Sequence, residues 1–124
     1  MQKESDSNRR KFVRLNFLVD VVYSKRLSVR KEKISLSRNI SAGGICLIVY
    51  EELKKAQLLD LEIYLPGDDR PVKALGKVAW LNEFVIGDVS KGRRFDAGIE
   101  FVKISKEDSD KVNKYVFEHT AVAD

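Results

Sequence analysis

The chain has 124 residues, of which 44% are hydrophobic, so it can form one ordinary domain with its own core. No stretch approaches the roughly 18 apolar residues of a membrane span, there is no hydrophobic signal segment, and there is one cysteine, so we expect a cytoplasmic protein without disulfides. Residues 1–49 contain 11 Lys and Arg against 4 Asp and Glu, and this basic excess favours an anionic partner, which could be nucleic acid, an acidic protein or a phosphorylated small molecule.

The chain begins with a polar lead, residues 1–8, which lacks large hydrophobes and is expected to be mobile. Six segments then show two-residue alternation or a short run of branched apolar residues, as strands do. In chain order these predicted strands are 15–23, 34–36, 45–49, 59–65, 72–80 and 95–101. The predicted turns between them are 25–33, 39–44, 66–69 and 87–94, whereas 51–57 fits either one helical turn or a loop.

The end of the chain changes from two-residue to helical periodicity. Ser105 followed by Asp108 indicates a capped helix start. The apolar face of that helix then recurs at i, i+3, i+4 and i+7 in Val112, Tyr115, Val116 and His119. The pattern as a whole predicts an all-β, mainly antiparallel fold, in which six or seven strands close a barrel and a C-terminal α-helix plugs one open end.

Residues that could carry catalysis are scarce. His119 is the only histidine and is expected to be a packed or partly exposed helix residue. Cys46 lies in an apolar strand and is expected to be a core residue. One His and one Cys cannot form a Cys/His zinc site, and Gly43-Gly44 is not followed by the Lys-Ser or Lys-Thr of a phosphate-binding loop. The sequence therefore predicts no catalytic residue, no metal and no enzyme.

Two segments carry side chains suited to an anionic nucleotide. The first contains Arg9, Arg10 and Arg14, just before the first predicted strand. Guanidinium groups form bidentate hydrogen bonds to phosphate or to the guanine O6/N7 edge, and they stack on purine rings. Taken alone, this segment is equally a solvated basic terminus.

The second segment is Asn39-x-Ser41-x-x-Gly44, which also includes Gly43. Its amide and hydroxyl are two residues apart, so in an extended chain they lie on one side and can meet the edge of a guanine. Gly44 permits a positive φ or a close approach of the backbone to a ligand. Taken alone, this segment is equally an ordinary polar turn.

Together, the two segments resemble the PilZ family, which carries an RxxxR element followed by a [D/N]xSxxG element. Arg10-x-x-x-Arg14 and Asn39-x-Ser41-x-x-Gly44 match them in order and in separation. The strands Gly76-x-Val78-x-Trp80 and Gly98-Ile99-x-Phe101 resemble two further family elements. The resemblance implies a PilZ-type β-barrel over residues 9–118, after the lead and before a tail at 119–124.

The resemblance also implies the ligand, the bacterial second messenger cyclic di-GMP. Arg10 and Arg14 would contact guanine and phosphate, Asn39 and Ser41 would read a guanine edge, and Gly44 would leave room for the base. Arg9 occupies the family position that influences stoichiometry, which predicts two ligand molecules per protomer and no other cofactor. The implied role is a receptor that folds its lead over the barrel and signals to a protein partner.

Two other functions stay open on the sequence. One is a PilZ-like protein–protein adaptor that binds no nucleotide. The other is a small basic barrel that binds nucleic acid, which is disfavoured because most aromatic residues other than Phe12 fall on strand faces with core-like periodicity. Nothing in the sequence selects among motility, polysaccharide synthesis and gene control as the process served.

Overall fold

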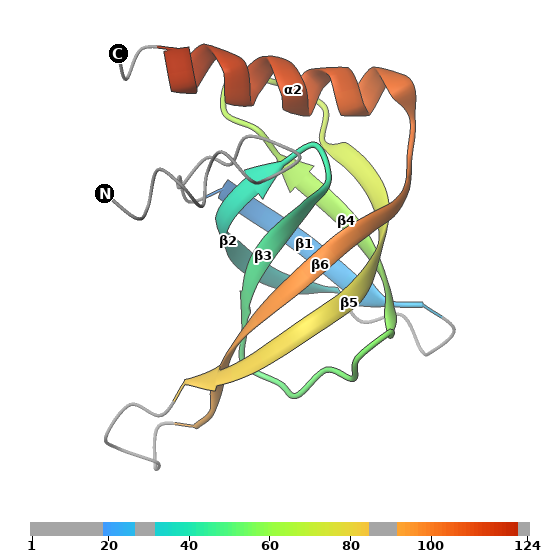
Figure 1. Ribbon diagram of the computed structural model, residues 1–124, viewed down its shortest axis with the longest axis vertical. Coiled ribbons are helices and arrows are strands. Elements are labelled where there is room, and N and C mark those ends of the chain that lie inside the picture. Colours follow the sequence, from blue (N-terminus) through green and yellow to red (C-terminus); the bar gives the residue numbers. More distant parts are fainter. Residues whose placement is uncertain (1–18, 27–31, 85–91, 122–124) are drawn as a thin grey trace, which may run out of the picture.

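The computed structural model describes residues 19–26, 32–84 and 92–121 of the chain. Within them lie six strands and one helix (Figure 1). The elements are β1 (Val19–Lys25), β2 (Lys33–Ser41), β3 (Gly44–Val49), β4 (Leu58–Tyr64), β5 (Val72–Phe84), β6 (Arg94–Ile104) and α2 (Lys106–Ala121). The predicted mobile lead at residues 1–8 lies outside the described residues.

The six strands close into a barrel in the order β1-β2-β3-β6-β5-β4. Each neighbouring pair is antiparallel, and β1 closes the barrel by pairing with both β2 and β4. Closure leaves no unpaired strand edge among the described strands, which removes the usual risk of edge-to-edge aggregation. The predicted antiparallel barrel with a C-terminal helix is confirmed.

The barrel interior is filled by the alternate apolar side chains that the sequence pattern indicated. On β4, for example, Leu59, Leu61 and Ile63 are almost fully buried, whereas the residues between them are more exposed. The helix α2 lies across one end of the barrel and adds Val112, Tyr115 and Val116 to the same core (Figure 1). The chain between β3 and β4 passes across the other end, where the buried Leu53 joins the core.

The start of α2 is fixed by two polar contacts. The Asp108 amide donates to Ser105 Oγ over 3.1 Å, which confirms the predicted cap. The Asp108 carboxylate in turn accepts from the Lys73 amide over 3.0 Å, and so ties the helix to β5. Within the described residues, no helix is long and apolar enough to cross a bilayer.

Several details refine or differ from the sequence pattern. Residues 51–57 form a loop with one turn, which is the second of the two predicted alternatives. Strand β5 continues beyond Trp80 to Phe84, because it pairs with β6 as far as Arg94. Its register with β6 shifts between Leu75 and Gly76 and again between Val78 and Trp80. Bulges of this kind cannot be read from two-residue alternation, since each one moves the following side chains to the opposite face.

A carboxylate in the connection between β3 and β4 ties that connection to two strands, β1 and β2. Glu51 accepts a hydrogen bond from the Tyr23 hydroxyl over 2.7 Å and pairs with Lys25 over 2.8 Å and Lys33 over 3.9 Å. Burial alone would raise the pKa of Glu51, but the hydrogen bonds from Lys25 and Tyr23 and the charges of both lysines together lower it. Burial, followed by the bond to Glu51, raises the pKa of Tyr23.

The Glu51 contacts predict a defined pH dependence of stability. A carboxyl group whose pKa is lower in the folded state stabilises the fold above its unfolded pKa, near 4.3, and loses that contribution as the pH falls through the folded pKa. We expect Glu51→Gln to lower the free energy of unfolding near neutral pH by about 1–2 kcal/mol. Urea unfolding near neutral pH and near pH 3 checks this, because the difference between the two proteins should shrink in acid. An equal difference at both pH values would contradict it.

Candidate ligand-binding site

A β-bulge in β2 decides which side chains reach the outside of the barrel. The register with β3 passes from Ser37 opposite Leu47 to Asn39 opposite Cys46, so Arg38 is the extra residue. Before the bulge Ser37 points into the core, and after it Ile40 does, with both fully buried. The bulge therefore places Asn39 and Ser41 together on the outer face, as the sequence analysis predicted for these two side chains.

The hairpin that follows is held by short polar contacts. The turn itself is only Ala42 and Gly43, since Asn39 and Ser41 belong to β2, and this is shorter than the predicted turn. The Gly43 amide donates to Ser41 Oγ over 3.2 Å, and the Gly43 carbonyl accepts from the Phe101 amide over 3.0 Å. Ser41 is buried, and its hydroxyl proton is still available for donation because the oxygen acts as the acceptor here.

Gly44 lies against the backbone of the neighbouring strand β6 and does not face open space. A Cβ at this position would overlap the carbonyl oxygen of Ile99 and lie 3.3 Å from its carbonyl carbon. Gly44 is not among the described residues with positive φ, so the positive φ that the sequence allowed is not used. The close approach that requires glycine here is made by the β6 backbone.

Strand register connects Asn39 to an aromatic side chain three strands away. Asn39 pairs with Cys46, Cys46 with Gly98, and Gly98 with Trp80. Paired residues share a face of the sheet, so these four residues form one row on the outside of the barrel, which we call the Asn39 row. Cys46, predicted as a core residue, is buried within it, whereas the Trp80 indole lies directly over Gly98 and is 42% exposed.

A second outer row runs beside the first. Ser41 pairs with Gly44, Gly44 with Glu100, and Glu100 with Lys77. Glu100 is exposed at this position, and Lys77 is half-buried. A molecule that extends from Asn39 and Ser41 across β3 would therefore meet Glu100 on β6 and then Lys77 and Trp80 on β5. Sequence reasoning missed these neighbours, since only the register brings them to the site.

The aromatic residues are less buried than their periodicity indicated. Trp80 was placed on the core-facing side of its strand, but the bulge after Val78 turns it outward. In all, five described aromatic residues are exposed: Tyr50, Tyr64, Trp80, Phe84 and Phe117. The predicted core-like placement is wrong for Trp80, the one of these five that the alternating pattern had put on a core face, and the argument against nucleic-acid binding that used this placement is weaker.

The predicted ligand arginines Arg9, Arg10 and Arg14 lie outside the described residues. The first described residue, Val19, pairs with Ser37 on β2. The described chain therefore begins beside the strand segment that carries Asn39 and Ser41.

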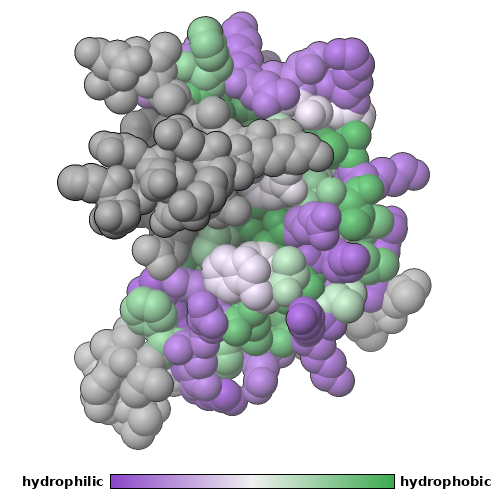
Figure 2. Space-filling view, in the orientation of Figure 1, coloured by the Kyte–Doolittle hydropathy of each residue, from purple (hydrophilic) through white to green (hydrophobic). Residues whose placement is uncertain are grey.

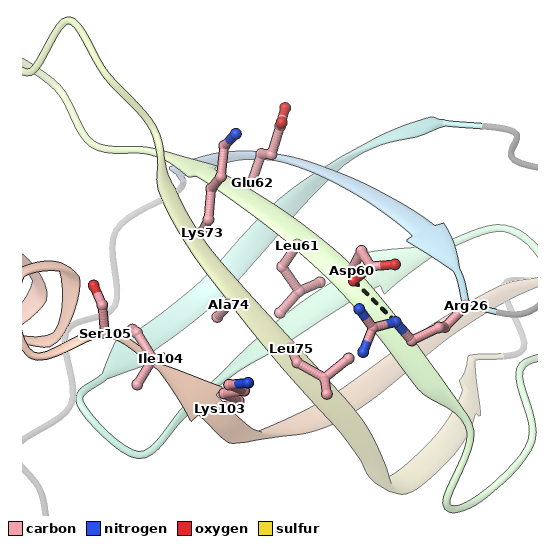
Figure 3. A pocket seen from close by; sticks show the side chains of 10 residues that line it. All are labelled: Arg26, Asp60, Leu61, Glu62, Lys73, Ala74, Leu75, Lys103, Ile104 and Ser105. Atoms are coloured by element: carbon pink, nitrogen blue, oxygen red, sulfur yellow. Dashed lines mark ion pairs between the residues drawn. The ribbon is translucent and has the colours of Figure 1, made fainter.

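Two hollows of the described surface lie elsewhere. One, of about 420 Å³, is lined by Arg26 after β1, by charged and apolar residues of β4, β5 and β6, and by Ser105, and its Arg26 pairs with Asp60 over 3.5 Å (Figure 3). A neighbouring hollow of about 390 Å³ shares Glu62, Lys73 and Ser105 with it. Among the predicted ligand residues that the structure describes, Asn39, Ser41, Gly43 and Gly44 line neither hollow. Their charges are of both signs and partly paired, so neither presents an evident anion site.

Groups that could support catalysis are not assembled in the described part of the chain. The ring of His119 packs against Tyr115 at a centroid distance of 4.2 Å, and His119 Nδ1 lies 2.8 Å from the Tyr115 carbonyl oxygen. No three His, Cys, Asp or Glu residues of the described segments are grouped as metal ligands.

Comparison with known families agrees with this geometry. The family model described as the PilZ domain matches residues 8–118. The chain belongs to the PilZ domain family. This PilZ domain has no match among the curated proteins searched.

Solved structures show the same fold. The Bacillus subtilis inhibitor of motility MotI/DgrA is 25% identical, with a TM-score of 0.73 over 91% of this chain and 52% of that one. The PilZ domain of YcgR from Escherichia coli, solved with c-di-GMP, is 14% identical, with a TM-score of 0.70 over 93% of this chain and 94% of that one. The MrkH–c-di-GMP complex of K. pneumonia is 14% identical, with a TM-score of 0.70 over 93% and 54%. The chain spans about half the length of MotI/DgrA and of MrkH.

The strand elements that resemble the PilZ family have a physical explanation in this domain. A Cβ at Gly98 would overlap the Trp80 indole, so glycine at one position makes space for tryptophan at the other. A Cβ at Gly76 would overlap Ile99 inside the barrel. The two elements therefore fit one another across β5 and β6, and through Gly98 they also shape the outer row that contains Asn39.

Proposed function

We propose that this PilZ domain is a non-enzymatic cyclic di-GMP receptor. When the ligand binds, the receptor orders its lead and the Arg-rich segment that follows it, together called the lead from here on, over the barrel, and so signals to a partner protein. The observation that supports this most is the β2 bulge. It places Asn39 and Ser41 side by side on the outer face, in register with Trp80 and next to the strand that the lead enters.

Each residue of the proposed site has a chemical role. Arg10 and Arg14 supply bidentate hydrogen bonds to the phosphates and to the guanine O6/N7 edge. Asn39 and Ser41 bind a guanine edge with an amide and a hydroxyl. Gly43 and Gly44 have no side chains and so leave space beside them for the base. Trp80 offers a flat aromatic surface to the same ligand, since its exposed indole lies in the Asn39 row.

The length of the lead suits this arrangement. Arg14 precedes Val19 by five residues and Arg10 by nine. An extended chain covers about 3.3 Å per residue, so the two arginines can reach up to about 17 Å and 30 Å from Val19. Asn39 is only two residues beyond Ser37, the partner of Val19, and both arginines can therefore reach a ligand lying there.

Two solved structures that share the fold contain the proposed ligand. The PilZ domain of YcgR and MrkH, which share the fold, were both solved with c-di-GMP. Their sequence identity of 14% carries the fold alone, so the ligand of this chain rests on its own arginines and on the outer rows.

Calorimetric titration with cyclic di-GMP tests the proposal, with Trp80 fluorescence as a second readout. The chain has one tryptophan, so any change in emission belongs to Trp80. We expect saturable binding with a change in emission for cyclic di-GMP, and much weaker binding for cyclic di-AMP, which has the same phosphate ring but lacks the guanine edge. Equal binding of both would contradict guanine recognition. An absence of binding to either would favour the adaptor function.

The presence of Arg9 beside Arg10 predicts how many cyclic di-GMP molecules each protomer binds. A third guanidinium beside Arg10 can stack on a guanine and stabilise an intercalated ligand pair, so we expect two cyclic di-GMP per protomer. Arg9→Ala should lower this number to one while keeping the first site. Calorimetry that gives one site for the unaltered protein, unchanged in Arg9→Ala, would contradict this.

A further inference from the structure

An apolar surface lies on the outside of the barrel, on the same sheet face as the proposed ligand site. Ile34 is 82% exposed and Tyr50 72%, which is unusual for large apolar side chains on strands or beside them. Leu36, Trp80 and Phe84 are each about 40% exposed. Figure 2 shows apolar surface between the polar side chains on the visible side of the barrel. Contiguous exposed surface of this kind usually marks an interaction site.

The register places these side chains on one outer face, with the charged residues of β6 between them. Leu36 pairs with Ile48, Ile48 with Asp96, and Asp96 with Asn82, while Arg94 pairs with Phe84. Ile34 lies two residues before Leu36, and Trp80 and Phe84 lie two residues before and after Asn82. We call this surface the apolar face, and its residues are Ile34, Leu36, Ile48, Tyr50, Trp80 and Phe84.

The charged groups that the structure describes within and around the apolar face form several ion pairs. Arg94 lies over the Phe84 ring at 4.7 Å from its centroid and pairs with Asp96 over 3.5 Å. At the border, Arg93 pairs with Glu83 over 2.7 Å and with Glu52 over 3.4 Å. Lys25 and Lys33 pair with Glu51, as described above. Among the described residues, the face therefore has no charge excess that would attract a partner of opposite charge.

This charge balance suits one partner in particular, a second copy of the same chain. In a two-fold contact the same patch meets itself, so a patch with a charge excess would repel its own copy. An apolar patch with internally paired ions does not. Strand addition is not available to such a partner, because the barrel is closed and these strands are paired on both sides. Contact must therefore be made by side chains.

We propose that this chain forms a two-fold homodimer through the apolar face. Four strands about 4.8 Å apart and a length of about 20 Å give roughly 400 Å² of projected area per copy. Standard interfaces bury about 800 Å² per partner, so the dimer is expected to be weak and to depend on concentration. This proposal goes beyond nucleotide binding and can be tested without a ligand.

Sedimentation equilibrium of the ligand-free chain over a range of concentrations tests the dimer. We expect a monomer–dimer equilibrium for the unaltered chain and a dissociation constant at least tenfold higher for Ile34→Glu. Phe117→Glu is the matched control, because Phe117 is 72% exposed but lies on α2, away from the face. It should dimerise like the unaltered chain. Tyr50→Glu provides an independent variant if Ile34→Glu has a lowered melting temperature.

Two results would overturn the proposal. One is an unaltered chain that stays monomeric at every concentration, which would leave the face to a different protein. The other is a dimer that both Ile34→Glu and Tyr50→Glu leave intact, or that Phe117→Glu weakens as much as they do, which would place the contact elsewhere.

Discussion

Replacing Gly44 by alanine is expected to destabilise the barrel by about 2–4 kcal/mol, although the change adds a single methyl group. That methyl group would overlap the carbonyl oxygen of Ile99 and lie 3.4 Å from the Glu100 Cα. All of these atoms belong to the backbone of β6, so no side chain can rotate to make space. The β3–β6 pairing would have to open at the point where β3 begins. Thermal unfolding should show a melting temperature lower by about 10 °C.

Gly92→Ala is the control for Gly44→Ala. Gly92 has a φ of 94° and no neighbouring atom within 4 Å of an added Cβ, so alanine there costs only backbone strain. That strain is about 1 kcal/mol. If Gly44→Ala melts no lower than Gly92→Ala, the close approach of β3 to β6 does not constrain this position.

The expected behaviour of Gly44→Ala also changes how its effect on ligand binding should be interpreted. The resemblance to the PilZ family implies that Gly44 leaves room for a base, and this stays a prediction. Because the same glycine is required by the packing of two strands, weak binding by Gly44→Ala would not by itself show a lost ligand contact. Binding should therefore be compared with melting temperature in the same variant.

The fold was largely predictable from the sequence because the strand interiors follow one physical rule. Residues on β4 such as Leu59, Leu61 and Ile63 alternate because every second side chain enters the core. The helix was predictable from the capping Ser105 and the spacing of Val112, Tyr115 and Val116. The barrel closure between β1 and β4 is a long-range pairing, and only the general need to protect strand edges indicated it.

The bulges could not be predicted, and they determine the outer face. The alternation Val72, Ala74, Gly76, Val78 continues formally to Trp80, yet the register shift after Val78 turns Trp80 outward. The bulge at Arg38 also turns the following side chains outward. Without it, Asn39 and Ser41 would point into the core, as Ser37 does. A bulge depends on pairing between strands far apart in the chain, so local sequence carries little trace of it.

The candidate site was predicted in part. Asn39 and Ser41 were found because their spacing and their neighbour Gly44 form a recognisable element. Trp80 and Glu100 were not found, since their place beside that element depends on the pairing of β3 with β6 and of β6 with β5. An exposed tryptophan lying over a glycine on the neighbouring strand is the signal that structure adds.

Replacing Arg10 and Arg14 by alanine is expected to have the largest effect on ligand binding. Each guanidinium supplies a charge-assisted hydrogen bond worth about 1.5–3 kcal/mol, so each single variant should bind cyclic di-GMP about tenfold more weakly or worse. The double variant should lose about a hundredfold or more. Both residues precede Val19, where β1 begins, so the melting temperature of the ligand-free barrel should not change. Calorimetric titration and thermal unfolding of the same preparations measure the two effects.

Lys11→Ala is the matched control for the arginine variants, because it removes the same charge from the same segment without touching either motif arginine. If the lead acted only as a general positive charge, Lys11→Ala would weaken binding as much as Arg10→Ala. Specific guanidinium contacts predict a small loss for Lys11→Ala and a large one for Arg10→Ala and Arg14→Ala. Should Arg10→Ala and Arg14→Ala both bind like the unaltered protein, the proposed site is wrong. If instead the arginine variants lose affinity and keep their melting temperature, the arginines act on the ligand itself. Replacement of Gly44 differs, because it acts through the fold.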